Sequence, residues 1–494
     1  MQRSKSLNHP FSIPVVGGLL FILWVAGCGV SKSSFDPTTP PAPPGPQTYF
    51  APSVSFDGAA SNMSTYTLDD KADTFSQTIY SPKTQPGSQV LDAGHFSVLQ
   101  RGLRSLNIST TYIFDPTLNP AAYVPTDLTH LTKVVNSSFA LELAGQAGGF
   151  AQLQISGQDA SGQEQSIQQP VVPLVAATQC PNLSSAQTYQ FITIPAPLIP
   201  SGTGPIGGAW DPTTETAYGS VDISSSGSTV NFKNIRQFTL PSVGGTGAPA
   251  QPPSSSLTGV CGPTNFGNTI VVPGQAVITN PGVVPPIPVS PQATIGIGLS
   301  GLLVEDNTGP GGGALAGSSP PLPYDNVLGA GTGAVGLPKP SAALDTSAVV
   351  GAQYLGFIYA TGVYNGPHVS SGWSSHLASF GFSTVPTGCA SVAPKTSTLI
   401  YGGDFTNDDP SAPTYKDGFG NCNFAIDLGS EDSANNGLYS HATVWVGVGY
   451  AGNTTAAPPF QAVAVVGQLN GKYAIFLIGT DSTQPWAIYL LQSN

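Results

Sequence analysis

The sequence is poor in charge, and above all in positive charge. Lys, Arg, Asp and Glu make up 8% of its 494 residues, with 14 basic against 26 acidic residues and a formal net charge of −12. No lysine or arginine lies between Arg236 and Lys339. Proteins that bind nucleic acid neutralise its phosphates with lysine and arginine. The composition therefore argues against nucleic acid as a partner.

The first apolar run of the chain is too short to cross a membrane. Val15–Cys28 is uncharged and mostly apolar, whereas a membrane-spanning helix needs about 20 apolar residues for a hydrocarbon core of roughly 30 Å. Arg3 and Lys5 precede the run, and small residues lead into the cysteine. A basic start, a short apolar middle and small residues before a cut are the layout of a secretory signal.

The end of this leader, Val25-Ala26-Gly27-Cys28, resembles the lipobox of bacterial lipoproteins. The resemblance covers residues 1–28. It implies that residues 1–27 are removed, that lipid is attached to the Cys28 sulfur, and that the new amino terminus is acylated with fatty acids such as palmitate. Several acyl chains, at about 0.8 kcal/mol per buried methylene, make such an anchor effectively permanent. Gly29, in place of an aspartate, implies the outer membrane of a two-membrane bacterium.

Two other interpretations of the leader stay open: an ordinary signal peptide whose cleavage site precedes a cysteine, and a short buried apolar segment. Residues 28–47 after it are dense in proline. Such sequences form extended, semi-rigid polyproline-like spacers. We therefore expect a tether here, with docking of a proline-recognition module as the alternative.

Besides Cys28, four cysteines remain, which are Cys180, Cys261, Cys389 and Cys422. An even number in an exported chain predicts two disulfides, with three possible connectivities. Neighbours in sequence close shorter loops at lower entropic cost, which favours Cys180–Cys261 and Cys389–Cys422. A zinc site is disfavoured because there is no close Cys-x-x-Cys pair.

The composition favours an all-β body. Glycine (59) and proline (47) are abundant, yet 22 Phe, 17 Tyr and 5 Trp are more than a disordered chain carries. We expect a loop-rich antiparallel β-sandwich or closed β-sheet. Its parts are a β-rich region over residues 48–240, a Pro/Gly/Ser-rich connection over 241–292 and a second β-rich region over 293–494.

Local patterns predict individual elements within these regions. Hairpins are expected around the turns Gly157–Gly162 and Ser224–Ser228. The one helix expected in the body is Ser138–Ala144, with Ser138 as its cap and glycines soon after it. Strands are expected at Tyr189–Ile194, Ala293–Ser300, Tyr354–Tyr359 and Ala442–Val448.

The strongest local prediction is a hairpin near the carboxyl terminus. Asn470-Gly471 separates two apolar runs, and this pair supplies the two left-handed residues of a type I′ turn. Closing it pairs Leu469 with Lys472, Val465 with Phe476 and Val463 with Ile478, and it places Val466, Ile475 and Leu477 on the other face. Both faces are apolar, so both should be covered. Trp486–Leu491 would add a third strand.

Two motifs resemble ligand sites without the context that those sites need. Gly331–Gly336 matches the dinucleotide fingerprint, but Pro338 and Pro340 forbid the helix that must follow it. The acidic loop Asp404–Asp417 offers oxygen ligands suited to calcium. Its spacing does not match the calcium-hand pattern, so a solvated loop is the preferred interpretation. No cofactor and no metal site are predicted.

Catalytic motifs are equally weak. Gly298–Leu302 lacks the last glycine of a nucleophile elbow. Ser374 or Ser375 with His376 and Asp404 forms a triad only on paper, because adjacent residues of a strand point to opposite faces. Five histidines have no zinc spacing: His95, His130, His368, His376 and His441. Trp373 and Tyr401 could stack on sugars, although burial in a core is commoner.

The sequence therefore favours a lipid-anchored envelope protein that binds an envelope or extracellular ligand or serves a structural role, and an enzyme is disfavoured. The alternative is a surface-anchored hydrolase of polysaccharide or peptide, whose paired carboxylates come from separate strands and leave no local signature. A body that itself forms an outer-membrane barrel is the third hypothesis, and the many prolines and expected disulfides oppose it.

Overall fold

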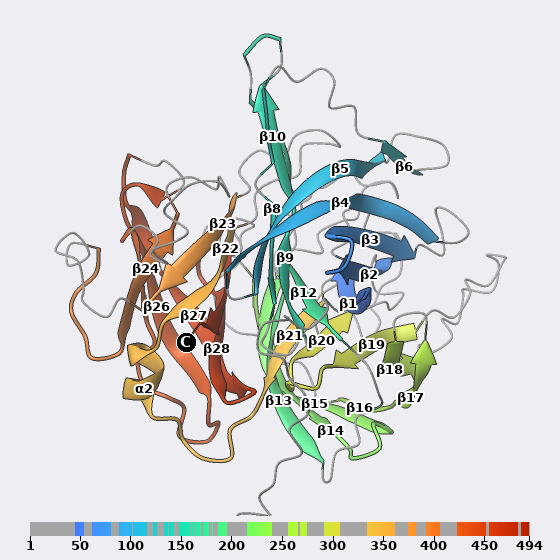
Figure 1. The fold of residues 1–494 in the computed structure, drawn as a ribbon. Coiled ribbons are helices and arrows are strands. Elements are labelled where there is room, and N and C mark those ends of the chain that lie inside the picture. Colours follow the sequence, from blue (N-terminus) through green and yellow to red (C-terminus); the bar gives the residue numbers. More distant parts are fainter. Residues whose placement is uncertain are drawn as a thin grey trace, which may run out of the picture. The chain divides into compact units, whose positions relative to one another are not determined.

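The computed structural model describes residues 45–494 except for these segments: 54–61, 81–87, 101, 116–121, 126–132, 137, 143–147, 159, 163, 169–170, 177–179, 181–185, 195–214, 240–254, 265–266, 274–290, 307–332, 361–373, 382–391, 406–421, 451–453, 483–485 and 494. The leader and most of the tether expected from the sequence lie outside the described residues. The body is all-β, as predicted, and its strand pairs are antiparallel (Figure 1).

Eight strands close into the N-terminal barrel, because β5 pairs with both β4 and β8 while β12 pairs back to β1. They are β1 (Gln47–Ser53), β2 (Asn62–Asp69), β3 (Thr74–Tyr80), β4 (Ser88–Gln100), β5 (Leu103–Asp115), β8 (Ser138–Glu142), β9 (Gly148–Gln152) and β12 (Val172–Val175). Strand alternation puts Tyr49 and Ala51 in the barrel interior and Phe50 on the outside. β6 (Ala122–Pro125) pairs with the last residues of β5. A small separate sheet is formed by β7 (Lys133–Asn136), β10 (Gln154–Gln158) and β11 (Glu164–Gln168).

The helix expected at Ser138–Ala144 is wrong, since this segment contains strand β8. Ala140 packs inside the barrel while Phe139 and Leu141 pack outside it. Ser138 caps no helix. Its hydroxyl accepts from the Gln154 amide at 2.7 Å and donates to the Gln154 carbonyl at 3.0 Å. Neighbouring strands cover both faces, and tertiary packing overrides the local helix signal.

Nine strands form the middle sheet, in the order β16-β15-β14-β13-β21-β20-β19-β18-β17. They are β13 (Gln187–Thr193), β14 (Glu215–Ile223), β15 (Thr229–Thr239), β16 (Ser255–Thr258), β17 (Val260–Thr264), β18 (Gly267–Pro273), β19 (Pro291–Ile297), β20 (Leu303–Asp306) and β21 (Ala334–Pro338). Within 241–292, expected to be a loop-rich connection, the described residues form β16, β17, β18 and the start of β19. One sheet runs across both boundaries drawn from composition.

The C-terminal barrel is closed by eight strands in sequence order. They are β22 (Tyr354–Ala360), β23 (Ser374–Phe380), β24 (Leu399–Asp404), β25 (Phe424–Asp427), β26 (Leu438–Val446), β27 (Ala457–Leu469), β28 (Lys472–Gly479) and β29 (Trp486–Gln492). The short helix α2 (Thr346–Gly351) precedes them.

The predicted hairpins are confirmed. β10 pairs with β11 across Gly157–Gly162, and β14 pairs with β15 across Ser224–Ser228. The β27–β28 register is the predicted one, and Asn470 (φ 51°) and Gly471 (φ 77°) are both left-handed. β29 adds the expected third strand.

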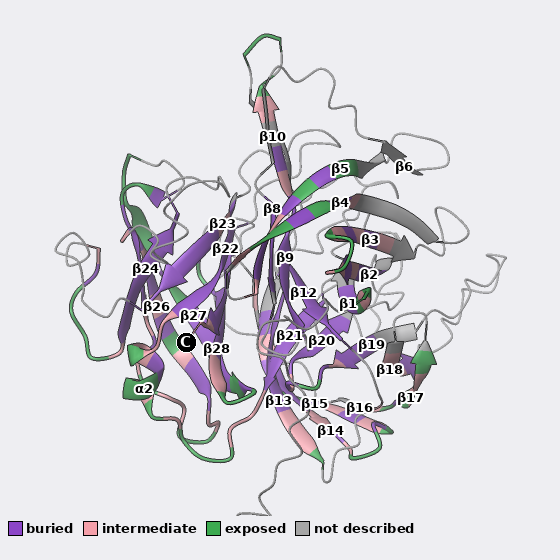
Figure 2. Ribbon diagram, in the orientation of Figure 1, coloured by how far each residue is buried: buried purple, intermediate pink, exposed green. Residues whose placement is uncertain are grey.

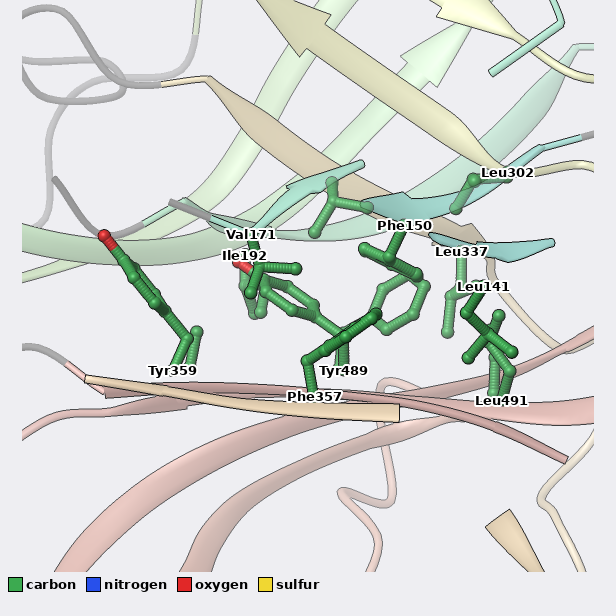
Figure 3. Packing of buried hydrophobic residues seen from close by; sticks show 14 of the residues in the cluster. Leu141, Phe150, Val171, Ile192, Leu302, Leu337, Phe357, Tyr359, Tyr489 and Leu491 are labelled. Carbon is green, nitrogen blue, oxygen red and sulfur yellow. The ribbon is translucent and has the colours of Figure 1, made fainter. Parts of the chain in front are cut away.

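The two faces of the β27–β28 hairpin belong to different cores. Val466, Ile475 and Leu477 fill the interior of the C-terminal barrel. Val463 and Phe476 face outward into a cluster that also takes side chains from the N-terminal barrel and the middle sheet (Figure 3). Figure 2 shows the result as buried strands where these bodies meet, including β9, β12, β21 and β28. We call this cluster the junction core.

Candidate functional site

The candidate site is one end of the C-terminal barrel, which we call the loop end. Here β22, β24, β26 and β28 finish and β23, β25, β27 and β29 begin, so the chain leaves and re-enters the barrel four times. Loops held by a rigid scaffold are where binding residues concentrate. Barrel mouths are also a common position for ligands.

Helix α2 covers the opposite end of this barrel. Asp345 caps the helix by accepting from the amides of Ser347 (3.0 Å) and Ala348 (3.4 Å). These bonds lower the pKa of Asp345, the bond from the Ser347 hydroxyl most of all. The side chain of Val349 packs with the barrel interior, and the Tyr354 hydroxyl donates to the Val349 carbonyl at 2.6 Å. The helix therefore covers this end of the barrel.

Aromatic side chains gather inside the loop end, around Trp486. Its ring centroid lies 5.4 Å from that of Phe460, nearly parallel, 5.6 Å from that of Tyr450 and 6.0 Å from that of Phe424. The ring of His376 meets Tyr450 edge to face at 5.3 Å. Trp486 and Phe460 keep 7% and 6% of their surface exposed, and His376 is half-buried. The group forms the outermost layer of the barrel core.

A buried polar pair accompanies the rings. The Asn423 side-chain amide donates to the Asp404 carboxylate at 2.7 Å, and the two residues are only 4% and 3% exposed. The remaining side-chain oxygen of Asn423 has no hydrogen-bond partner among the described residues. The Asn423 carbonyl accepts from the Gly447 amide at 2.7 Å, which ties the pair to the turn that carries Tyr450.

Of the two triads considered from the sequence, the one that uses Ser375 is not assembled. The Ser375 side chain faces out of the barrel, and the Ser375 carbonyl accepts from the side-chain Nε2 of Gln152 at 2.8 Å. His376 follows the inward face of Ala378, so the two side chains point apart, as strand geometry predicts. Asp404 lies opposite Ala378, one diagonal step from His376. The side chain of Ser374 lies outside the described residues.

The solvated loop expected at Asp404–Asp417 stays a prediction, with calcium binding as its alternative. Asp404 is described, whereas Asp408, Asp409 and Asp417 lie outside the described residues. Within the described part of the chain, no three His, Cys, Asp or Glu side chains are grouped so that they could hold a metal ion.

The dinucleotide match falls on a strand. β21 pairs with β13 and β20, so no helix follows the glycines. A side chain at Gly336 would meet the Gln190 carbonyl at 2.9 Å, which explains the glycine by close strand packing. Gly331 lies outside the described residues. The Gly298–Leu302 segment is the turn between β19 and β20, with Gly301 at φ +93°.

Cys180 and Cys261 form a disulfide with a Cα–Cα distance of 5.6 Å, the first of the two expected pairings. It joins the segment before β13 to strand β17. Cys422 is disulfide-bonded, and Cys389 lies outside the described residues, as does Cys28.

Three of the other singled-out residues are described, and they lie apart from the ring cluster. His95 and His441 are exposed, and Tyr401 is a buried member of a small cluster on the outside of the barrel. His130, His368 and Trp373 lie outside the described residues.

Glu305 is a site that sequence reasoning missed. It lies opposite Ile295 and Ala334 in the apolar interior of the middle sheet and is 2% exposed. One of its carboxyl oxygens has no partner among the described residues, and burial raises its pKa to about 8. The available signal was an acid directly after Leu302-Leu303-Val304, within the stretch that lacks lysine and arginine.

None of the helices in the described residues has the length and hydropathy to span a membrane. No protein-family model and no curated protein sequence matches the chain. Among solved structures it is similar to intact Ap-TbpB (N and C lobes), with 7% identity over 92% of this chain and 79% of that one and a TM-score of 0.20. A mutant of transferrin binding protein B from Haemophilus parasuis Hp5 (6% identity, 91% and 77% covered) and isotype 1 of that protein from serogroup B Neisseria meningitidis (10% identity, 91% and 75% covered) also give 0.20. Scores this low carry no inference about function.

Proposed function

We propose that this chain is an exported binding protein of a bacterial envelope, held in the membrane through lipid on Cys28. The loop end of the C-terminal barrel would present the binding surface to an envelope or extracellular ligand. The observation that carries the proposal is that the two ends of this barrel differ. A packed helix covers one end, while at the other the ends of four strand pairs surround aromatic rings and a buried polar pair.

The anchor is tested by intact-mass spectrometry and membrane fractionation of the full chain, expressed in a bacterium that processes lipoproteins. The expected product begins at Cys28, carries fatty acids and sediments with membranes. Cys28→Ala should lose the fatty acids and the cut before residue 28, while Gly29→Ala, a matched change at the next residue, should still be lipidated. An intact leader or a fatty-acid-free Cys28 in the wild type would refute the anchor.

The hydrolase alternative is tested on the same preparation with glycosidase, esterase and protease substrates. We expect no turnover. Turnover that Asp404→Asn or Ser375→Ala abolishes would replace the binding proposal with an enzymatic one.

A further inference from the structure

The loop end of the C-terminal barrel contains one polar group that the fold leaves incomplete. The side-chain N–H of Asn423 donates to Asp404. Asn423 is only 4% exposed, and its side-chain oxygen has no hydrogen-bond partner among the described residues. Buried polar atoms are nearly always hydrogen-bonded, because an unmade bond costs about 1–3 kcal/mol. This oxygen therefore calls for a hydrogen-bond donor.

The position of Asn423 places that donor next to the ring cluster. The Gly447–Tyr450 turn is held to Asn423, because the Gly447 N–H donates to the Asn423 carbonyl. The same turn places Tyr450 against Trp486. Gly449 lies next to the Asn423 side chain, since a Cβ added to Gly449 would be 3.8 Å from Asn423 Nδ2. Its φ of +94° is one that glycine adopts readily. Val448 between the two glycines is 61% exposed. This small turn therefore lies at the surface, beside the polar pair and the rings.

From this geometry we infer that the loop end binds a saccharide, a conclusion that rests on the proposed binding function. Sugar hydroxyls donate to the Asn423 oxygen and to the Asp404 carboxylate, and the apolar C–H face of a sugar ring packs on aromatic faces such as Trp486. Phosphorylated ligands are disfavoured by the carboxylate and by the lack of lysine or arginine in the described loop-end residues. A calcium ion needs six to eight oxygens, more than this pair supplies.

The test is binding of the full lipidated chain, in detergent, to a printed array of defined oligosaccharides, followed by titration with the strongest responder. Asn423→Ala should weaken binding at least tenfold. The matched control Asn435→Ala, at the end that α2 covers, should leave it unchanged. Trp486→Phe keeps an aromatic ring and should weaken binding less than Asn423→Ala. If Asn423→Ala does not fold, Trp486→Phe provides the test instead.

Three results would overturn the inference. One is a wild-type chain that retains no oligosaccharide while its Cys28 carries fatty acid, which leaves the anchor in place and removes the saccharide. A second is that Asn423→Ala and Trp486→Phe both fold and retain as much oligosaccharide as the wild type. Binding of Ca²⁺ alone, lost in Asn423→Ala without any glycan retention, would also overturn it.

Discussion

At the scale of single residues, Glu305 is an acid buried in the apolar interior of the middle sheet. Glu305 shares its face with apolar residues such as Ile295 and Leu303, and the sequence around it lacks lysine and arginine from Gln237 to Pro338. Burial without a counter-ion disfavours the charged form, so the pKa rises, here to about 8. The carboxyl is therefore mostly protonated in the folded protein at neutral pH.

This burial predicts a stability that falls with pH. Glu305 ionises near pH 4.5 when unfolded and near 8 when folded. Between these values the folded state holds the extra proton, so the free energy of unfolding decreases as pH rises through the interval and levels off above it. Each unit of pKa difference corresponds to about 1.4 kcal/mol. We expect a decline of about 5 kcal/mol across this interval of about 3.5 pH units.

Glu305→Gln should remove this decline, as measured by denaturant unfolding at several pH values from 5 to about 9. The exposed Asp73→Asn is the matched control, and it should leave the slope unchanged. The same slope in Glu305→Gln and in the wild type would contradict the assignment.

At the scale of elements, strand identity follows a period of two, and the turn chemistry decides where strands meet. The β27–β28 hairpin combines both signals, because its apolar runs suit a sheet covered on two faces and Asn470-Gly471 suits a type I′ turn. The Ser138–Ala144 segment lacks such a turn signal. Its capping serine and short apolar run fit a helix until strands β5 and β9 are placed beside it.

Gly471→Ala should destabilise the protein by about 1 kcal/mol through its backbone alone. An added Cβ at Gly471 meets no atom within 4 Å, but the φ of 77° strains any residue with a side chain. Gly351 in α2 has the same open space without a positive φ, so Gly351→Ala should be neutral or slightly stabilising. Thermal unfolding compares the two, and equal effects would argue against the turn geometry.

At the scale of the whole molecule, the junction core couples bodies that each have their own interior. Phe150 of the N-terminal barrel stacks on Tyr489 of the C-terminal barrel at 4.8 Å and meets Phe476 edge to face at 5.4 Å. Ile192 and Leu337 of the middle sheet join the same cluster (Figure 3). Aromatic pairs of this kind contribute beyond the area that they bury.

Phe150→Ala should cost about 3–5 kcal/mol and should shift or separate the calorimetric transitions of both barrels, because it removes contacts between them. Phe75→Ala is the matched control, since Phe75 lies inside the N-terminal barrel and stacks on Tyr66. That variant should lower the transition of the N-terminal barrel alone. Identical calorimetric profiles for the two variants would show that the junction core does not couple the barrels.

The sequence by itself determined the all-β class, the antiparallel hairpins and the two-sided burial of β27 and β28, because these follow from local periodicity and turn chemistry. It also predicts the anchor at Cys28, which lies in a leader outside the described residues. Only the tertiary structure decided that two of the sheets close into barrels, that residues 255–264 and 267–273 join the middle sheet, and that Asp404, Asn423 and Trp486 meet at one end. Such groupings depend on pairing between strands far apart in the chain, and no local pattern of residues encodes that pairing.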